Sequence, residues 1–209
     1  STLPIVNFIR KFKDVNLLFM FFFKNNESIM NYSLKPKTYL CPIFCILVKT
    51  NFMLIKTVRG YTPSLGERCF IAENATLIGD LIMGNDCSVW YQAVVRGDVN
   101  AIRIGNQVNI QDGAVIHATY ETAATTIGNK VSIGHNAIVH GCTIEDNVLI
   151  GMGSIVMDHC VVGSNSIIAA GAVVTQNTII PPGSIYAGVP AKKIKSIDPH
   201  LQQNEIERI

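Results

Sequence analysis

Three histidines, His117, His135 and His140, are the residues of this chain that are best suited to chemistry. Neutral imidazole nitrogens are good ligands for zinc, and a site with three protein ligands keeps a further position open for water or substrate. Three converging histidines would therefore build a catalytic metal site. Whether they converge depends on the elements that carry them.

Most of the chain follows a repeat of six residues. An aliphatic residue recurs at every sixth position, apart from one step of nine residues, one of eleven and one of five. Glycine often follows the aliphatic residue, and a small or branched residue often occupies the fifth position. The aliphatic positions are Ile71, Leu77, Met83, Val89, Val95, Ile104, Ile110, Ile116, Ile127, Ile133, Val139, Ile144, Ile150, Val156, Val162, Ile168 and Val174.

A hexapeptide period of this length predicts an all-β fold, a left-handed parallel β-helix. Each hexapeptide is one short strand and a turn, three hexapeptides make one triangular coil, and successive coils stack by parallel strand pairing. The aliphatic residues fill the interior of the prism, and the small residues relieve crowding at its corners. A β-sandwich is disfavoured, because its apolar residues alternate with a period of two.

The repeat fixes where the histidines point. His117 and His140 are the second residues of the hexapeptides that open at Ile116 and Val139. These are the first and fourth hexapeptides of a run, so we expect the two histidines to stack on one face, one strand spacing apart. His135 belongs to the third hexapeptide and lies on a different face, out of their reach. The sequence therefore predicts a metal site shared between subunits of a cyclic trimer, with His135 supplied by the neighbour.

The segment from about residue 59 to about residue 195 is similar to the γ-class carbonic anhydrase family of hexapeptide-repeat proteins. The resemblance is carried by Arg96-Gly97-Asp98, Asn109-Ile110-Gln111-Asp112-Gly113, Ile116-His117, Ile133-Gly134-His135-Asn136 and Val139-His140-Gly141-Cys142-Thr143. It implies reversible hydration of carbon dioxide to bicarbonate by a homotrimer, with the three-histidine metal site between subunits. The ending from Ala187 to Lys192 also fits, but hexapeptide acyltransferases share it.

The chemistry of such a site needs a divalent metal that lowers the pKa of water toward neutrality and supplies the attacking hydroxide. Zn²⁺ suits three imidazoles, and Fe²⁺ or Co²⁺ would fit as well. Gln111 occupies the same repeat position as His117, one hexapeptide earlier, so its amide is a candidate to hydrogen-bond water or substrate. Asn109, two residues before, is a candidate to hold Gln111 or the substrate. The alternative for both is a solvated turn.

Three further candidates follow from the resemblance. Arg96 and Asp98 resemble a pair at the family's trimer interface, where a bidentate bond would fix the subunit register; the alternative is a surface ion pair worth little. Tyr186 lies in a segment comparable to one that holds a family tyrosine. The predicted site residues are therefore Gln111, Asn109, Arg96, Asp98 and Tyr186, beside the metal ligands His117, His135 and His140.

One departure from the best-studied branch of the family concerns proton transfer. That branch has a glutamate after its Arg-x-Asp motif and an acidic residue on a long loop, whereas here Val99 follows Asp98 and the loop of residues 118–126 is short. Protons would then leave through Glu121, Tyr186 or buffer. A trimeric metal-binding scaffold with weak or no turnover is therefore an alternative function. A hexapeptide acyltransferase is a third, but it needs one catalytic histidine rather than three.

Composition separates the first 52 residues from the rest. Residues 1–52 hold seven Lys or Arg and two Asp or Glu, whereas residues 53–209 hold ten and thirteen, so the larger part is mildly acidic and nucleic-acid binding is not expected. We interpret residues 1–52, which lack glycine and the repeat, as an extension upstream of a native start at Met53. A targeting or membrane-associating arm is the alternative, although the apolar run of residues 17–23 is too short to span a bilayer.

The chain thus divides into an N-terminal extension of residues 1–52, a β-helix domain of residues 53–190 and a C-terminal α-helix of residues 191–209. The helix is predicted from apolar residues that suit an amphipathic helix interrupted near Pro199, namely Ile194, Ile197, Leu201, Ile206 and Ile209. The six cysteines follow no pattern that demands disulfides, so we expect a cytoplasmic protein. A membrane is not expected as a partner.

Overall fold

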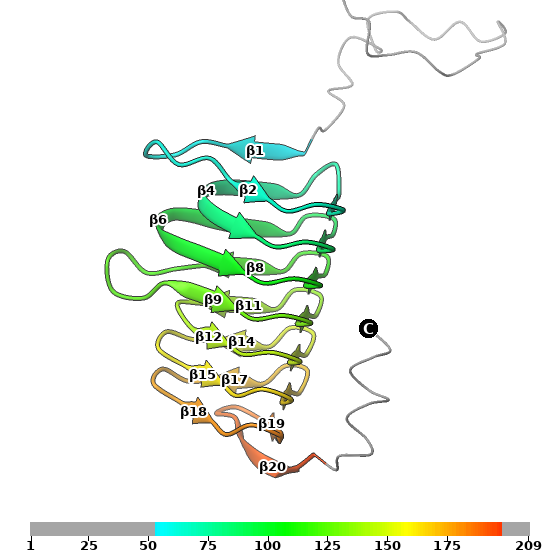
Figure 1. Ribbon diagram of the computed structural model, residues 1–209. Coiled ribbons are helices and arrows are strands. Elements are labelled where there is room, and N and C mark those ends of the chain that lie inside the picture. The colour runs from blue at the N-terminus through cyan, green and yellow to red at the C-terminus, as the bar shows by residue number, and fades with distance from the viewer. Residues whose placement is uncertain (1–52, 198–209) are drawn as a thin grey trace, which may run out of the picture. The chain divides into compact units, whose positions relative to one another are not determined.

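The computed structural model describes residues 53–197, and this part of the chain is a parallel β-solenoid of about seven turns. Figure 1 shows the turns stacked as rungs between β1 and β20. Within this range no helix exists that could cross a membrane. The strands are β1 (Leu54–Lys56), β2 (Ser64–Leu65), β3 (Phe70–Ile71), β4 (Thr76–Met83), β5 (Ser88–Val89), β6 (Val94–Ile104), β7 (Asn109–Ile110), β8 (Val115–His117), β9 (Thr125–Ile127), β10 (Ser132–Ile133), β11 (Ile138–His140), β12 (Thr143–Ile144), β13 (Leu149–Ile150), β14 (Ile155–Val156), β15 (Val161–Val162), β16 (Ile167–Ile168), β17 (Val173–Val174), β18 (Ile179–Ile180), β19 (Ser184–Ala187) and β20 (Lys192–Ser196).

The strands form two sheets that enclose a three-sided prism. One sheet has 8 strands in the order β20-β19-β16-β13-β10-β7-β5-β3 and makes one face. The other has 12 strands and covers two faces, with β8, β11, β14 and β17 on one and β9, β12, β15 and β18 on the other. The long strand β6 runs across the corner between these two faces, because it pairs with both β8 and β9.

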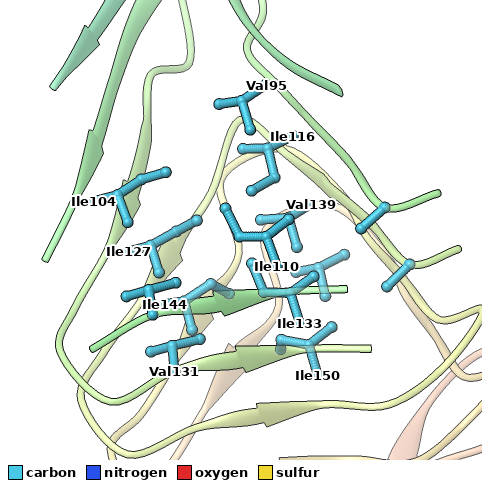
Figure 2. Close-up of a cluster of buried hydrophobic side chains, with 14 of the residues drawn as sticks. Val95, Ile104, Ile110, Ile116, Ile127, Val131, Ile133, Val139, Ile144 and Ile150 are labelled. Atoms are coloured by element: carbon cyan, nitrogen blue, oxygen red, sulfur yellow. The ribbon is translucent and has the colours of Figure 1, made fainter. Parts of the chain in front are cut away.

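The predicted aliphatic positions fill the interior of the prism. Ile110, Ile133 and Ile150 are in-register partners in consecutive coils, and each is 0% exposed. Figure 2 shows them beside the matching side chains of the other two faces. Burying one such side chain stabilises the fold by roughly 1.5–3 kcal/mol, so the repeated aliphatic position, rather than local strand propensity, sustains strands of two or three residues. The predicted core is confirmed, with Ile71 of the first coils partly buried.

The three irregular steps of the repeat all fall at one corner of the prism. Each step leads from the face of β8 and β11 to the face of β9 and β12, and the steps occupy residues 96–103, 117–126 and 140–143. The longest step contains a turn that is closed by an isolated bridge between Thr119 and Ala123. We call these three segments the irregular corner.

The C-terminal helix predicted from Ala191 is wrong where the structure describes it. Residues Lys192–Ser196 form β20, which pairs antiparallel with β19 and so caps the last coil. Backbone pairing with the free edge of β19 satisfies its N–H and C=O groups, whereas the apolar spacing contributes little, because Ile194 is 61% exposed. The remainder of the predicted helix, residues 198–209, and the predicted extension, residues 1–52, lie outside the described residues.

Candidate metal centre

His117 and His140 lie against each other at the irregular corner. They end β8 and β11 and are in-register Cα partners, so the predicted stacking is confirmed. Nδ1 of His117 lies 3.0 Å from Nε2 of His140. The two side chains are 16% and 34% exposed, so both rings reach the surface of the prism rather than its core.

The far side of each histidine ring contacts a carboxylate. Nε2 of His117 lies 3.0 Å from Oδ1 of Asp98, and Nδ1 of His140 lies 2.6 Å from Oδ1 of Asp158. Arg96 donates a hydrogen bond of 2.6 Å to the second oxygen of Asp98. Within the chain, Arg96 and Asp98 are thus joined by a single hydrogen bond, and the other carboxylate oxygen contacts His117.

The surroundings keep both carboxylates ionised and His117 neutral. Burial alone would raise the pKa of Asp98, but hydrogen bonds from His117 and Arg96 outweigh it and leave this pKa below its ordinary value. Asp158 behaves in the same way, since burial is outweighed by hydrogen bonds from Thr119 and His140 and its pKa is also lowered. Burial lowers the pKa of His117, against the opposing hydrogen bond to Asp98.

This arrangement of donors fits a cation between the two rings. An ionised carboxylate can only accept hydrogen bonds, so His117 presents Nε2–H to Asp98 and His140 presents Nδ1–H to Asp158. When both rings are neutral, no third proton is left for the facing nitrogens, 3.0 Å apart, and each of them offers a lone pair to a cation. Two nitrogens bound to one tetrahedral zinc at about 2.0–2.1 Å would lie roughly 3.3 Å apart. The pair thus has the chemistry and nearly the spacing of two zinc ligands.

His135 lies on a different face, as predicted from the repeat. It follows β10 in the 8-strand sheet, its side chain is 46% exposed, and its Nδ1 lies 3.0 Å from Oδ2 of Asp112. Within residues 53–197 of one chain, no three His, Cys, Asp or Glu side chains gather closely enough to hold a metal. Each of the three histidines therefore has its own carboxylate, but a single chain offers two ligands together and the third apart.

A pocket of about 230 Å³ lies beside His135. Gln111, Asn109, Trp90 and Asp112 also line this pocket. The side-chain oxygen of Asn109 accepts a hydrogen bond of 2.8 Å from Trp90 Nε1, so Asn109 holds the indole ring rather than Gln111. Gln111 and Asn109 thus lie with His135, on a different face from His117 and His140.

Tyr186 lies apart from both groups of residues. In β19 it is the in-register partner of Ile168 and packs partly buried against the core. It occupies an aliphatic position of the last parallel coil, so within the described chain it closes the prism rather than facing a histidine.

Three residues that contact this arrangement were missed from the sequence, namely Trp90, Asp112 and Asp158. The register contained a signal for each. Asp112 is two residues after Ile110 and His135 two after Ile133, and these isoleucines are Cα partners, so Asp112 and His135 stack. Asp158 is likewise stacked on Gly141, beside His140. Trp90 occupies the position of Gln111 one coil earlier.

Known proteins with the same repeat are similar to this chain in sequence and in structure. A family model described as bacterial transferase hexapeptide (six repeats) matches residues 141–176. Protein YrdA of Escherichia coli is 37% identical over 150 residues, which cover 69% of this chain and 82% of YrdA. A probable carbonic anhydrase of Methanocaldococcus jannaschii is 48% identical over 139 residues, covering 66% of this chain and 84% of that protein. A putative acetyltransferase of Bacillus cereus, of known structure, is 35% identical with a TM-score of 0.72, covering 76% of this chain and 90% of that one. The chain therefore belongs to the hexapeptide-repeat family that includes YrdA and the γ carbonic anhydrases.

Proposed function

We propose that this protein is a carbonic anhydrase-like metalloenzyme that hydrates carbon dioxide reversibly to bicarbonate. His117 and His140 of one copy and His135 of a second copy would hold the metal, in a homotrimer of left-handed prisms. The observation that carries the proposal is the close approach of Nδ1 of His117 and Nε2 of His140, 3.0 Å apart, with a carboxylate on the far side of each ring. Its support is the 48% identity to the probable carbonic anhydrase of Methanocaldococcus jannaschii.

The metal, Zn²⁺ or alternatively Fe²⁺ or Co²⁺, would supply hydroxide near neutral pH. The hydrogen bonds to Asp98 and Asp158 would fix the tautomers of His117 and His140, so that a lone pair of each ring would face the metal. Arg96 keeps Asp98 ionised and oriented.

The pocket beside His135 would bind the substrate. Its volume of about 230 Å³ exceeds what carbon dioxide or bicarbonate needs. The indole of Trp90, held by Asn109, gives the pocket an apolar wall that suits carbon dioxide. Gln111 lines this pocket, and its amide would donate a hydrogen bond to a substrate oxygen and so orient the carbon for attack.

Activity is tested by stopped-flow hydration of carbon dioxide, on protein purified without oxygen and assayed for metal. We expect turnover that disappears in His117→Ala, because one of the two facing ligands is lost. A metal-containing protein without turnover would contradict the enzyme and favour the scaffold.

The shared site is tested by mixing two defective variants, His117→Ala and His135→Ala. Each variant alone lacks a ligand at every site. If His135 acts across the interface, random mixed trimers combine an intact His117 from one copy with an intact His135 from the next, which restores about one site in four. Bound metal and turnover should both reappear after the variants are unfolded and refolded together. No recovery, with trimers re-formed, would overturn the shared site.

A non-catalytic metal-binding scaffold is the second candidate. It is favoured because the carboxylates beside the proposed metal ligands already bond to histidines and are not free to transfer protons. Asp98 and Asp158 both bond to ligand histidines, and Val99 stands where the better-studied branch has a glutamate. Glu121, on the exposed turn of the irregular corner, is then a candidate to export protons, with Tyr186 and buffer as the alternatives. Turnover that rises steeply with imidazole buffer and is insensitive to Glu121→Gln would assign proton export to buffer.

Acyl transfer is disfavoured as a third candidate function, since it needs one catalytic histidine rather than a stacked pair.

A further inference from the structure

Asp158 joins one of the proposed metal ligands to the turn that follows the other. Oδ1 of Asp158 accepts a hydrogen bond of 2.6 Å from Nδ1 of His140, and Oδ2 accepts one of 2.6 Å from the hydroxyl of Thr119. Its side chain is 14% exposed. Both carboxylate oxygens are therefore committed to the irregular corner, in a partly buried place where such bonds are strong.

The next coil of the prism places this carboxylate. Val156 of β14 is the Cα partner of Val139, so Asp158, two residues later, stacks on Gly141. Gly141 has a positive φ of 54°, and a Cβ added there would lie 2.8 Å from the Cβ of Ala123 and closer still to Oδ1 of Asp158. Only a residue without a side chain leaves room for the carboxylate to reach His140.

The other end of the connection is anchored as well. Thr119 belongs to the turn that directly follows His117, and its carbonyl oxygen accepts a hydrogen bond of 3.1 Å from Asn100. The amide of Gly141 donates to the carbonyl oxygen of His117 at 3.2 Å, so the backbones next to the two histidines are bonded to each other. Asp158 therefore closes a ring of bonds that includes both histidines.

We propose that Asp158 is a positioning residue for the metal: it holds His140 in the Nδ1–H tautomer, with Nε2 turned toward His117, and ties that ring to the turn after His117. This inference rests on the proposed function, because it assumes that His140 binds metal through Nε2. A charged acceptor on the remote nitrogen raises the basicity of the ligand, and loss of such a partner typically weakens metal affinity by about 10–100-fold.

The test is the zinc affinity of Asp158→Asn, measured by competition with a chromophoric chelator at fixed pH. Asparagine keeps the size and one acceptor but removes the charge, and we expect an affinity about 10–100-fold weaker than that of the unmodified protein. The matched control is Glu145→Gln, since Glu145 is a partly buried carboxylate whose two bonds, of 2.8 and 2.9 Å, go to Ser164 instead of a histidine. The control should keep its zinc affinity.

Two further readouts separate positioning from a loss of stability. The visible spectrum of the Co²⁺-substituted protein should change in Asp158→Asn and not in Glu145→Gln, because it reports the ligand field. Thr119→Val leaves the bond to His140 in place and should lose less zinc affinity than Asp158→Asn.

Equal losses of zinc affinity in Thr119→Val and Asp158→Asn would overturn the positioning role, as would an unchanged affinity and cobalt spectrum in Asp158→Asn. If the unmodified protein binds none of Zn²⁺, Fe²⁺ and Co²⁺, the proposed function itself fails. That result differs from one in which the unmodified protein binds zinc and Asp158→Asn binds it equally well.

Discussion

At the residue scale, the candidate centre is a row of four side chains in which protonation and stability are linked. The row runs in space from Asp98 through His117 and His140 to Asp158, and a polar atom of each side chain lies within 3.0 Å of one on the next. The pKa of His117 lies below its ordinary value of 6.5, and those of both carboxyl groups lie below 3.8. The unfolded chain therefore binds protons at a higher pH than the folded one at all three groups.

We expect the metal-free protein to lose stability in two windows as the pH falls. The first begins near 6.5, where the unfolded chain protonates His117 while the folded chain does not yet, and the second begins near 3.8, where the carboxyl groups follow. The free energy of unfolding, measured in urea with chelator present, should therefore decrease from pH 7 to pH 5. In His117→Gln the free energy of unfolding should change less between pH 7 and pH 5. An equal pH dependence in both proteins would contradict the lowered pKa of His117.

Two glycines with positive φ allow the cost of backbone strain to be distinguished from the cost of steric crowding near Asp158. Gly141 and Gly153 both have positive φ, 54° and 64°, but only Gly141 has neighbours that a Cβ would strike. We expect Gly153→Ala to cost about 1 kcal/mol in the free energy of unfolding, and Gly141→Ala to cost about 1–3 kcal/mol more through overpacking. Urea unfolding of both variants checks this, and equal costs would show that Asp158 moves aside freely.

At the element scale, the repeat predicted the fold because one physical requirement recurs in every coil. Each aliphatic position must fill the interior, and Ile110, Ile133 and Ile150 do so in register. The positions of His117, His135 and His140 on their faces followed from the same counting. The three interruptions of the period coincide with the irregular corner, where the stacked histidines lie. The interruptions of the repeat thus mark the corner of the prism that carries the stacked histidines.

Contacts between coils were less predictable from the sequence. Asp158 reaches His140 from 18 residues away, and this contact depends on the register of two coils and on the space left by Gly141. Asn109 was predicted to hold Gln111 or the substrate, and within the chain its side-chain oxygen accepts a hydrogen bond from the indole N–H of Trp90, a contact with the preceding coil. The apolar spacing of the terminal segment suits a helix, but β20 forms because the edge of β19 needs a hydrogen-bonding partner, and the spacing carries no information about that edge.

The terminal strand provides a test of this correction. Ile194 in β20 is 61% exposed, whereas Ile180 in β18 is 1% exposed. We expect Ile194→Ala to change the free energy of unfolding by less than about 0.5 kcal/mol, and Ile180→Ala to lower it by about 2–5 kcal/mol. Urea unfolding compares the two. A large loss from Ile194→Ala would mean that this side chain packs against protein, as a docked helix would require.

At the scale of the whole molecule, the face that carries His117 and His140 and the face that carries His135 cannot serve one metal within a single chain. The pocket with Gln111 and Trp90 lies with the lone histidine, so ligands and substrate pocket are divided between faces in the same way. In the proposed trimer, each interface would join the stacked pair of one copy to the pocket of the next. Metal binding and assembly then become linked equilibria.

This linkage gives a prediction for the dilute protein. Zinc that binds only between copies stabilises the assembly by about 2.7 kcal/mol per site when its free concentration is 100 times its Kd. Sedimentation velocity over a dilution series should therefore show the trimer persisting to lower protein concentrations with zinc than with chelator. His135→Ala should remove the difference, whereas Glu145→Gln should keep it. A monomer that binds one zinc per chain, at an affinity independent of protein concentration, would place all the ligands in one copy and contradict the division of the site.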